Sequence, residues 1–456
     1  MKKIVMLTFS LVNKNLMVFM KLYKSVFFFP SSFFPLVMVL FMLLNFGCKK
    51  SPTEPNETLS VSVEDVSCTE AWVKITSTNY QTPNTLTLYV NNEANQSITL
   101  VSSDTVLYVD SLLPNKSYTF NALLTTNNTK PITTEAQATT LDTTSHNFTW
   151  QTFTFGEHSS STLYDVAIID ENNIWAVGEI YMNDSLGIPD PIAYNAVHWD
   201  GKEWEVKKIS VEYKGNQTVA PLEGVFALPN NQIIFSSGLP YLPQSNGWKL
   251  YHLWDMGVLN QDDGGVSKIW GTSINDLYFV GRKGTIVHYD GKSWQKIESG
   301  TTTNIYDVYG ITGKDGSQRI YCAVSDFETT LKGILEISNN HINTLTSNIF
   351  GNIYTSWAPN TNQLYAGGHG LFKYANNVWS KVNIDASLIY RIRGDAVNNI
   401  YAVGGSGLIT HFNGVNWQHH YVEASASFKS CDIKGKTIVT VGEKNSKAII
   451  SIGKQI

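Results

Sequence analysis

Two hydrophobic patterns divide the chain after residue 56. Between residues 57 and 142, apolar side chains take every second position in seven short segments, such as AWVKITS (71–77) and SYTFNALLTT (117–126). Alternation of this kind is typical of strands with one face in a core and the other in solvent. Seven such strands in one short region predict a small β-sandwich.

From residue 147 onwards, apolar strands end in a small residue at intervals of about forty residues. Two copies align without a gap: NDLYFVGRKGTIVHYDGKSW (275–294) and NNIYAVGGSGLITHFNGVNW (398–417). Repeats of this length, with about four strands in each, indicate a β-propeller. The repeat predicts seven blades, whose marker strands end at Gly178, Gly238, Gly281, Ser325, Gly368, Gly404 and Gly442.

The last copy lacks an outer strand. It ends at Ile456 without the tryptophan that opens the outer strand elsewhere, whereas NFTWQTFTF (147–155) stands alone before the first copy. We therefore expect residues 147–155 to pair with the last copy, 427–456, and leave the ring without a free edge. The predicted fold class is all-β, with a small sandwich (57–142) followed by a seven-bladed propeller (147–456) that an N-terminal strand closes.

The first 48 residues have the pattern of a signal peptide. Within residues 20–48, two lysines precede a long apolar run, and Gly47 precedes Cys48. This order of charge, apolar core and cleavage site is typical of secretory targeting. The end of the segment resembles a bacterial lipobox, with Asn45 where leucine is usual, and the resemblance implies a lipidated Cys48. A membrane-spanning helix over residues 26–46 is the alternative, although two prolines interrupt its first half.

Residues 49–56 are polar and contain proline, so we expect a linker between the anchor and the sandwich. The segment LLPNKSYTF (112–120) resembles the fibronectin type III signature, in its leucine, proline and tyrosine spacing, with Lys116 in place of the usual threonine. Trp72 stands on an early strand, where that family keeps a core tryptophan. The resemblance implies a spacer module, and an unrelated immunoglobulin-like sandwich is the alternative.

The sequence IWGTSINDLYFVG…GTIVHYDGKSW (269–294) resembles repeats of bacterial propellers of the sialidase-repeat and photosystem II assembly-factor-like types. The resemblance rests on structural positions and therefore implies a fold rather than an activity. The sialidase Asp-box places its aspartate two residues before its glycine, whereas Asp290 is adjacent to Gly291 in this chain.

Composition excludes several kinds of function. The net charge of −5 is spread without long runs of one sign, so no nucleic-acid partner is expected. Only four arginines are present, which makes the arginine triad of sialidases improbable. Nucleophile elbows, phosphate loops, HExxH and paired-cysteine spacings are absent, and we expect no catalytic residues, no metal and no cofactor. His198, His288 and His411 recur in one slot of three repeats, which indicates a structural role.

A binding site is expected among side chains that break the repeat. These residues follow the glycine-ending strands or lie in the long insertions 179–195, 239–248 and 254–265. Aromatic and carboxylate side chains in such loops suit the recognition of a sugar or a protein, although solvated loop ends would look the same. The candidate ligand-binding residues are Glu179, Tyr181, Asp190, Tyr194, Tyr241, Trp254, Arg282, Asp326 and His369.

The sequence thus predicts a lipid-anchored protein of the bacterial cell envelope, on the periplasmic or surface side of the outer membrane. Its propeller would bind a protein or a glycan without catalysis. A glycan-cleaving propeller enzyme and an assembly factor for a membrane complex are the alternatives.

Overall fold

The computed structural model describes residues 57–80, 83–125, 131–314, 316–325, 333–338, 341–345, 351–386 and 388–456. The expected signal peptide with Cys48, the linker 49–56 and Asp326 lie outside these ranges. Leu59–Ser77 and Gln81–Ile456 form one compact unit, and all contacts given below lie within it. None of the helical structure in the described ranges is long and apolar enough to cross a membrane.

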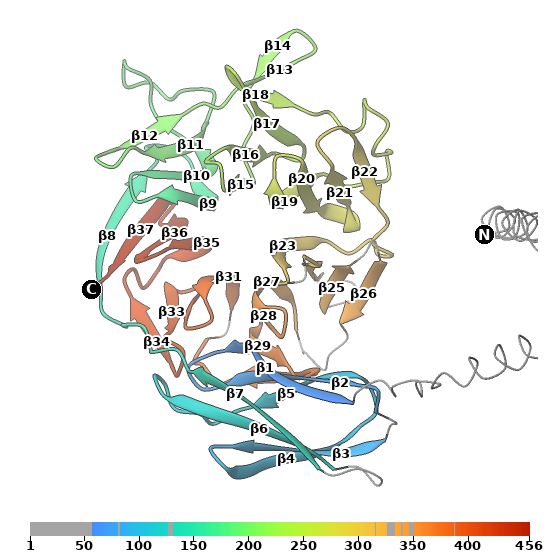
Figure 1. Cartoon of the computed structure of the whole chain (residues 1–456). Coiled ribbons are helices and arrows are strands. Elements are labelled where there is room, and N and C mark those ends of the chain that lie inside the picture. Colours follow the sequence, from blue (N-terminus) through green and yellow to red (C-terminus); the bar gives the residue numbers. More distant parts are fainter. Residues whose placement is uncertain are drawn as a thin grey trace, which may run out of the picture. The chain divides into compact units, whose positions relative to one another are not determined.

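Seven strands match the seven alternating segments of the first region. They form a three-stranded sheet in the order β1-β2-β5 and a four-stranded sheet in the order β4-β3-β6-β7 (Figure 1). Trp72 is only 3% exposed, and the Tyr118 hydroxyl accepts a hydrogen bond of 2.8 Å from the backbone N–H of Leu113. The strands are β1 (Thr58–Val66), β2 (Ala71–Thr78), β3 (Asn84–Val90), β4 (Glu93–Leu100), β5 (Asp104–Val109), β6 (Ser117–Thr125) and β7 (Ile132–Thr139).

The described residues after the sandwich form seven four-stranded antiparallel sheets, together with a small hairpin and a 3-10 turn. The first strand of each sheet contacts the first strand of the next, and β35 contacts β9, so the sheets follow one another in a closed circle (Figure 1). This all-β arrangement is that of a β-propeller. The first three sheets are β9 (Thr162–Asp170), β10 (Asn173–Ile180), β11 (Tyr194–Trp199) and β12 (Trp204–Lys207); β15 (Gly224–Ala227), β16 (Ile233–Ser236), β17 (Pro240–Gln244) and β18 (Gly247–Leu250); and β19 (Val266–Ser273), β20 (Asp276–Gly281), β21 (Ile286–Tyr289) and β22 (Trp294–Ile297).

The remaining strands continue the same four-strand order. They are β23 (Ile305–Thr312), β24 (Gln318–Val324), β25 (Gly333–Ser338) and β26 (His341–Leu345); β27 (Ile353–Asn360), β28 (Gln363–Gly368), β29 (Gly370–Ala375) and β30 (Val378–Val382); β31 (Ile389–Ala396), β32 (Asn399–Gly404), β33 (Leu408–Phe412) and β34 (Trp417–Tyr421); and β35 (Ser427–Lys434), β36 (Thr437–Lys444) and β37 (Lys447–Gln455) with β8 (Phe148–Phe155). The hairpin is β13 (Val211–Tyr213) and β14 (Asn216–Thr218), and the turn is η1 (Arg282–Gly284).

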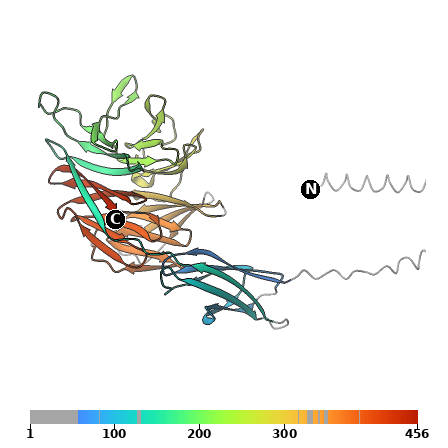
Figure 2. The same cartoon turned by 60° about the vertical axis from the view of Figure 1, so that its left-hand side comes forward.

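The last sheet is completed from the other end of the chain, as the sequence predicted. β8 pairs antiparallel with β37, in register from Ala448 opposite Phe155 to Gln455 opposite Phe148. Figures 1 and 2 show blue-green β8 running beside red β37. Backbone hydrogen bonds therefore join the first and last strands of the circle, and no sheet edge is left open at the junction.

The hydrophobic core is divided among the spaces between neighbouring sheets. One cluster joins Trp270, Tyr278 and Val280 of the third sheet with Val308 and Cys322 of the fourth. Residues of the second strand alternate between the cluster before and the cluster after their own sheet, which explains their nearly continuous apolar sequence. The cysteines Cys68, Cys322 and Cys431 are free and buried.

Tight glycine turns and tryptophans stand at the outer edges of the sheets. Gly201, Gly291 and Gly414 have φ angles of 95°, 88° and 99°, which the Asp-Gly and Asn-Gly turns require. Trp204, Trp294, Trp379 and Trp417 each pack against a core cluster near an outer strand.

We expect overpacking at Gly453 to weaken the ring closure. A Cβ atom at this position would lie 2.7 Å from the Trp150 ring and 2.7 Å from the Ile438 side chain. Gly453→Ala should therefore lower the free energy of unfolding by about 1–3 kcal/mol. In a Trp150→Ala background the part of this loss that comes from the Trp150 ring should disappear, while the contact with Ile438 remains. Equal losses in both backgrounds, measured by denaturant titration, would show that Trp150 is not part of the clash.

Candidate functional site

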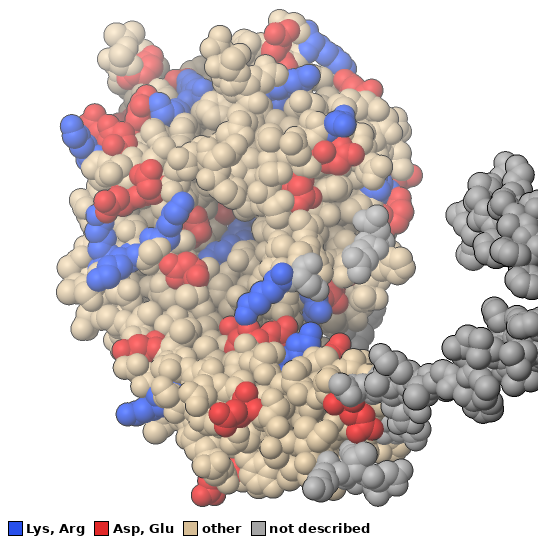
Figure 3. Space-filling model, in the orientation of Figure 1, with Lys and Arg blue, Asp and Glu red and all other residues tan. Residues whose placement is uncertain are grey.

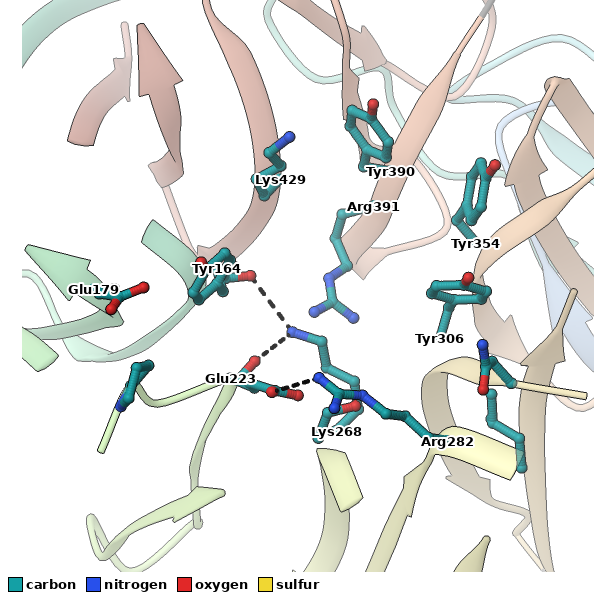
Figure 4. Close-up of a pocket in the computed structure, with 14 residues that line it drawn as sticks. Tyr164, Glu179, Glu223, Lys268, Arg282, Tyr306, Tyr354, Tyr390, Arg391 and Lys429 are labelled. Carbon is teal, nitrogen blue, oxygen red and sulfur yellow. Dashed lines mark hydrogen bonds and ion pairs between the residues drawn. The ribbon is translucent and has the colours of Figure 1, made fainter. Parts of the chain in front are cut away.

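A cavity of about 800 Å³ opens at the mouth of the ring, where the first strands of the sheets begin (Figure 4). Tyrosine and cationic side chains dominate its wall, and Figure 3 shows Lys and Arg gathered around the hollow at the centre of the ring. The lining residues are Tyr164, Glu179, Pro221, Glu223, Ser267, Lys268, Arg282, Asn304, Ile305, Tyr306, Tyr354, Tyr390, Arg391 and Lys429.

A repeated β-bulge creates this wall. In β31, Ile389 pairs with Gly404 and Arg391 pairs with Val403, so Tyr390 between them has no partner in β32. A bulge of this kind bends the strand and redirects the unpaired side chain. The same register shift leaves one residue without a partner in the second strand in six of the seven sheets. Each of these residues lines the cavity: Tyr164, Ser267, Tyr306, Tyr354, Tyr390 and Lys429.

The glycine at the end of the second strand makes room for the bulge. A Cβ atom at Gly404 would lie 1.9 Å from the carbonyl oxygen of Leu388, and one at Gly368 would lie 1.8 Å from that of Asn352. No side chain fits so close to a backbone oxygen, and only glycine allows the two strands to approach in this way. Similar distances occur at Gly178, Gly281 and Gly442.

A buried ion network forms the floor of the cavity. Arg391 donates from Nη2 to Oδ1 of Asp165 at 2.9 Å, from Nε to the Ser430 hydroxyl at 3.1 Å, and from Nη1 to Asp307. Lys268 donates to Asp165 Oδ2 at 2.9 Å. These residues come from five different first strands, so the network ties the sheets together across the ring axis.

The same network also closes the channel below the mouth. Lys268 and Arg391 line both the mouth cavity and a second cavity of about 250 Å³, whose other walls come from positions further along the first strands. Arg393 adds hydrogen bonds of 2.7 and 2.9 Å to the two oxygens of Asp307. The channel is therefore filled by paired charges at this level.

Burial alone would raise the pKa of Asp165, but Arg391 and Lys268 outweigh it and hold that pKa below the usual aspartate range. Burial is likewise outweighed at Asp307, where Arg391 and Arg393 lower the pKa. A carboxyl with a lowered folded-state pKa adds stability that is complete above the ordinary aspartate value of 3.8 and is lost as the pH falls below it.

An aromatic arc occupies one side of the mouth. The ring centroids of Tyr306 and Tyr354 are 5.3 Å apart, and those of Tyr354 and Tyr390 are 6.0 Å apart. The Lys429 ammonium lies 5.0 Å from the Tyr390 centroid and pairs with Glu443 at 3.0 Å. Burial raises the pKa of the Tyr354 phenol, so this group stays neutral and can donate a hydrogen bond.

Two of the sequence-predicted site residues lie at this cavity. Glu179 is at the end of β10, where its Oε1 accepts a hydrogen bond of 2.5 Å from the Tyr181 hydroxyl. Arg282, in η1, donates from Nη2 to Glu223 Oε1 at 2.9 Å. Both carboxylates of the mouth are thus already engaged by neighbouring side chains.

Other predicted residues lie elsewhere. Tyr181 and Tyr194 line a separate hollow of about 240 Å³, and Asp190 forms a salt bridge of 2.6 Å with Lys208. Tyr241 is 3% exposed and belongs to the core, so it does not reach any mouth.

The insertions account for the last two described candidates. Trp254 donates from Nε1 to the carbonyl oxygen of Asn260 at 2.9 Å and packs against the core of the second and third sheets. His369 is exposed, accepts from the backbone N–H of Asn352 at 3.2 Å, and lies 6.1 Å from the Tyr354 ring without lining the cavity.

The three histidines of the repeated slot share one geometry, which fits the structural role expected from sequence. His198 and His288 each place Nε2 2.9 Å from an oxygen at the start of the second strand, on Asn173 and Asp276 respectively. The third, His411, has the same contact with Asn399 at 3.0 Å. Among the described residues, the group close enough to share a metal ion lies outside the mouth and comprises His146, His411 and His420.

The arginines leave no free guanidinium for a sialidase-like triad. Arg282 pairs with Glu223 and Arg319 with Glu336, while Arg391 and Arg393 both bind Asp307. All four arginines of the chain are thus paired with carboxylates.

No protein-family model matches the sequence, and neither does any curated protein. Among solved structures, the chain is similar to "YCF48 bound to D1 peptide", with 12% identity, a TM-score of 0.46, and coverage of 69% of this chain and 99% of that chain. It is also similar to YCF48 from Cyanidioschyzon merolae, with 13% identity, a TM-score of 0.42, and coverage of 66% and 98%.

A third similar structure is the extracellular domain of BT4673 from B. thetaiotaomicron, with 11% identity and a TM-score of 0.47. The match covers 88% of this chain and 59% of that one. At these identities the similarity concerns the fold alone, and a function has to come from the residues of the site.

Removing the Arg391 guanidinium should destabilise the ring strongly. Arg391→Met leaves Asp165 and Asp307 short of a buried partner, which should cost about 3–5 kcal/mol of unfolding free energy at pH 7. Arg319→Met, at a half-exposed pair, should cost less than about 1 kcal/mol. Denaturant titrations at falling pH should show the Arg391→Met deficit shrinking below the ordinary aspartate pKa of 3.8, and a deficit independent of pH would contradict the network.

Two adjacent glycines test the bulge. Gly404→Ala should lower the unfolding free energy by at least about 2 kcal/mol, because the new Cβ meets a backbone oxygen that cannot move away without disrupting β31. At Gly405 the nearest atom to a new Cβ is 3.6 Å away, and Gly405→Ala should change stability by less than about 0.5 kcal/mol. Equal effects in thermal unfolding would refute the proposed close approach.

Proposed function

We propose that this chain is a non-catalytic recognition protein whose seven-bladed propeller, residues 147–456, binds an extended segment of a partner protein at its mouth. The observation that carries the proposal is the arc of bulge-positioned tyrosines, Tyr306, Tyr354 and Tyr390, beside the cavity of about 800 Å³. Tyrosine rings of this kind offer a large apolar surface with a polar end, at small cost in side-chain entropy.

The cations of the mouth are already engaged by neighbouring groups. Lys429 flanks the arc and pairs with Glu443, while Arg391 on the floor pairs with Asp165 and Asp307. Lys268 donates to Asp165 and to the carbonyl oxygens of Tyr164 and Glu223. A partner would therefore meet a fixed polar floor rather than an unpaired charge. We infer a protein segment that packs its body on the tyrosines and presents polar groups to the floor.

Catalysis is less well supported than binding. Glu179 and Glu223 are the carboxylates of the mouth, and each accepts a hydrogen bond from a neighbouring side chain, Tyr181 and Arg282 respectively. A glycan-cleaving enzyme would need a free acid and base pair flanking its substrate. Sugars also stack on tyrosines, so a glycan ligand remains the competing outcome of the binding test.

We further propose that the rest of the chain presents this mouth outside the cytoplasm. The sheet orders β1-β2-β5 and β4-β3-β6-β7 and the Tyr118 contact support a fibronectin type III-like spacer over residues 57–142. The sequence pattern of residues 1–48 supports a signal peptide with lipidation at Cys48, followed by a linker over 49–56. Such an anchor would hold the propeller at the bacterial cell envelope, where an assembly role for a membrane complex is one form of partner binding.

A selection for ligands tests the proposal directly. A displayed library of random peptides and an array of glycans should be probed with the full chain, and each enriched ligand retested against variants. Tyr354→Ala and Tyr390→Ala should each weaken peptide binding by about 5- to 30-fold, as expected for aromatic anchors worth about 1–2 kcal/mol.

Tyr213→Ala is the matched control, because this tyrosine is partly exposed but does not line the cavity. It should leave the affinity unchanged. If only glycans are enriched and the same tyrosine substitutions weaken their binding, the ligand of the mouth is a sugar rather than a protein. Ligands of either kind whose binding is unchanged by both Tyr354→Ala and Tyr390→Ala would show that the mouth is not the site.

A further inference from the structure

A second polar cluster lies away from the mouth, where the segment between β7 and β8 crosses the sheet β31–β34. Thr144 fixes this segment: its backbone N–H donates to the Asn413 carbonyl oxygen at 3.1 Å, and its hydroxyl donates to that of Asn398 at 2.7 Å. These contacts hold the next histidine of the segment, His146, against His411 of β33, with ring centroids 4.7 Å apart.

The neighbours of the two rings determine which nitrogens carry protons. His411 Nε2 faces Asn399 Oδ1 at 3.0 Å, and the orientation of that amide is fixed because its Nδ2 donates to Asp395 at 2.8 Å. In the equivalent slot, His288 faces a carboxylate, which can only accept. His411 therefore donates from Nε2 and keeps a lone pair on Nδ1.

His146 has the matching arrangement. Its Nε2 lies 2.8 Å from Asn416 Oδ1, and the tautomer that donates from Nε2 to this oxygen again leaves a lone pair on Nδ1. The two Nδ1 atoms face each other at 2.8 Å. In this tautomer the two lone pairs repel each other unless a proton or a metal ion lies between them.

His420 supplies a third nitrogen. One ring nitrogen from each of the three histidines lies within 4.8 Å of the others. The Nε2 atom of His420 is buried and has no hydrogen-bond partner, which is unusual for a polar atom in a folded protein. The ring is held by Phe148 and Trp150 of β8, at centroid distances of 5.1 and 5.8 Å.

We propose that His146, His411 and His420 form a binding site for a divalent transition-metal ion that prefers imidazole ligands, with Zn²⁺ as the expected occupant. Metal–nitrogen bonds of about 2.0–2.1 Å in tetrahedral geometry place neighbouring nitrogens about 3.4 Å apart. The separations of 2.8 Å and up to 4.8 Å bracket this value, so small rotations of the rings complete the coordination.

The surroundings have the features of a metal site. Asn399 and Asn416 accept from the outer nitrogens of two ligands, which is the usual way in which a protein orients metal-binding histidines. A hollow of about 780 Å³ is lined by His146 and His420, which leaves room for water or another donor in the fourth position.

The ligands belong to three parts of the chain that the ion would hold together. His146 precedes β8, whereas His411 and His420 come from β33 and β34 of the neighbouring sheet. An ion here would fasten the entry of the closing strand to the ring and stabilise the folded state according to its concentration and affinity.

The test uses the full chain, purified without a polyhistidine tag and stripped with a chelator. Equilibrium dialysis against Zn²⁺ should give one ion per chain, and Co²⁺ should give the strong visible absorption of tetrahedral coordination. His146→Gln and His420→Gln should each weaken Zn²⁺ binding at least tenfold, while Asn416→Ala should weaken it by about 10- to 100-fold through the orientation of His146.

His419→Gln is the matched control, because this neighbouring residue is not part of the three-histidine group. Thermal unfolding with and without Zn²⁺ shows whether the variants are folded. In chelator the ligand variants should have the melting temperature of the unsubstituted chain, but Zn²⁺ should no longer raise it. The site would be overturned by absence of binding to the unsubstituted chain, by unchanged affinity in His146→Gln and His420→Gln, or by an equal loss in His419→Gln.

Discussion

The close approach between a glycine and the backbone of the adjacent first strand governs the interior of this ring. At Gly404 and Gly368 the space where a side chain would begin is filled by a carbonyl oxygen. The approach accommodates the extra residue of the bulge, and this residue turns toward the mouth. The residue after the bulge then points to the ring axis, which is how Asp307 and Arg391 meet there. One backbone constraint thus sets both the wall and the floor of the cavity.

The floor and the wall have complementary properties. Arg391, Asp165 and Asp307 are almost completely buried, and each satisfies the others, so their positions are fixed by mutual pairing. The tyrosines above them are partly exposed and make few hydrogen bonds of their own. A rigid charged base beneath adaptable aromatic surfaces is suited to holding a ligand in one orientation without reacting with it.

Periodicity was sufficient to predict the strands, because a repeated fold repeats its core. The marker strands and the pairing of residues 147–155 with the last copy both follow from alternation and counting. Glu179 and Arg282 were found in the same way, but the tyrosines of the cavity escaped prediction for a physical reason. Tyr306 and Tyr390 lie inside strands, and only the register reveals that they are skipped by their partners. The repeated glycines were the one sequence signal of the bulge. A position that must be glycine indicates that backbone atoms of the neighbouring strand occupy the place of its side chain.

The group of His146, His411 and His420 could not be predicted from the repeat alone. His411 occupies a recurrent slot, and its contact with Asn399 is equivalent to those of His198 with Asn173 and His288 with Asp276. What distinguishes it from His198 and His288 is His146, which is distant in sequence and reaches it only because the connecting segment follows the sheet. A repeat analysis compares equivalent positions and therefore overlooks a non-repeated neighbour.

The pairing of β8 with β37 also has a consequence in time. During synthesis β8 leaves the ribosome before any propeller sheet has formed, and its partner β37 leaves last. The backbone N–H and C=O groups of β8 therefore stay unpaired while the other sheets assemble. Such a distant pairing closes slowly compared with local hairpins. In that interval a waiting strand can be captured by another unfinished ring, and dimers exchanged through this strand would be the characteristic by-product of crowded biosynthesis.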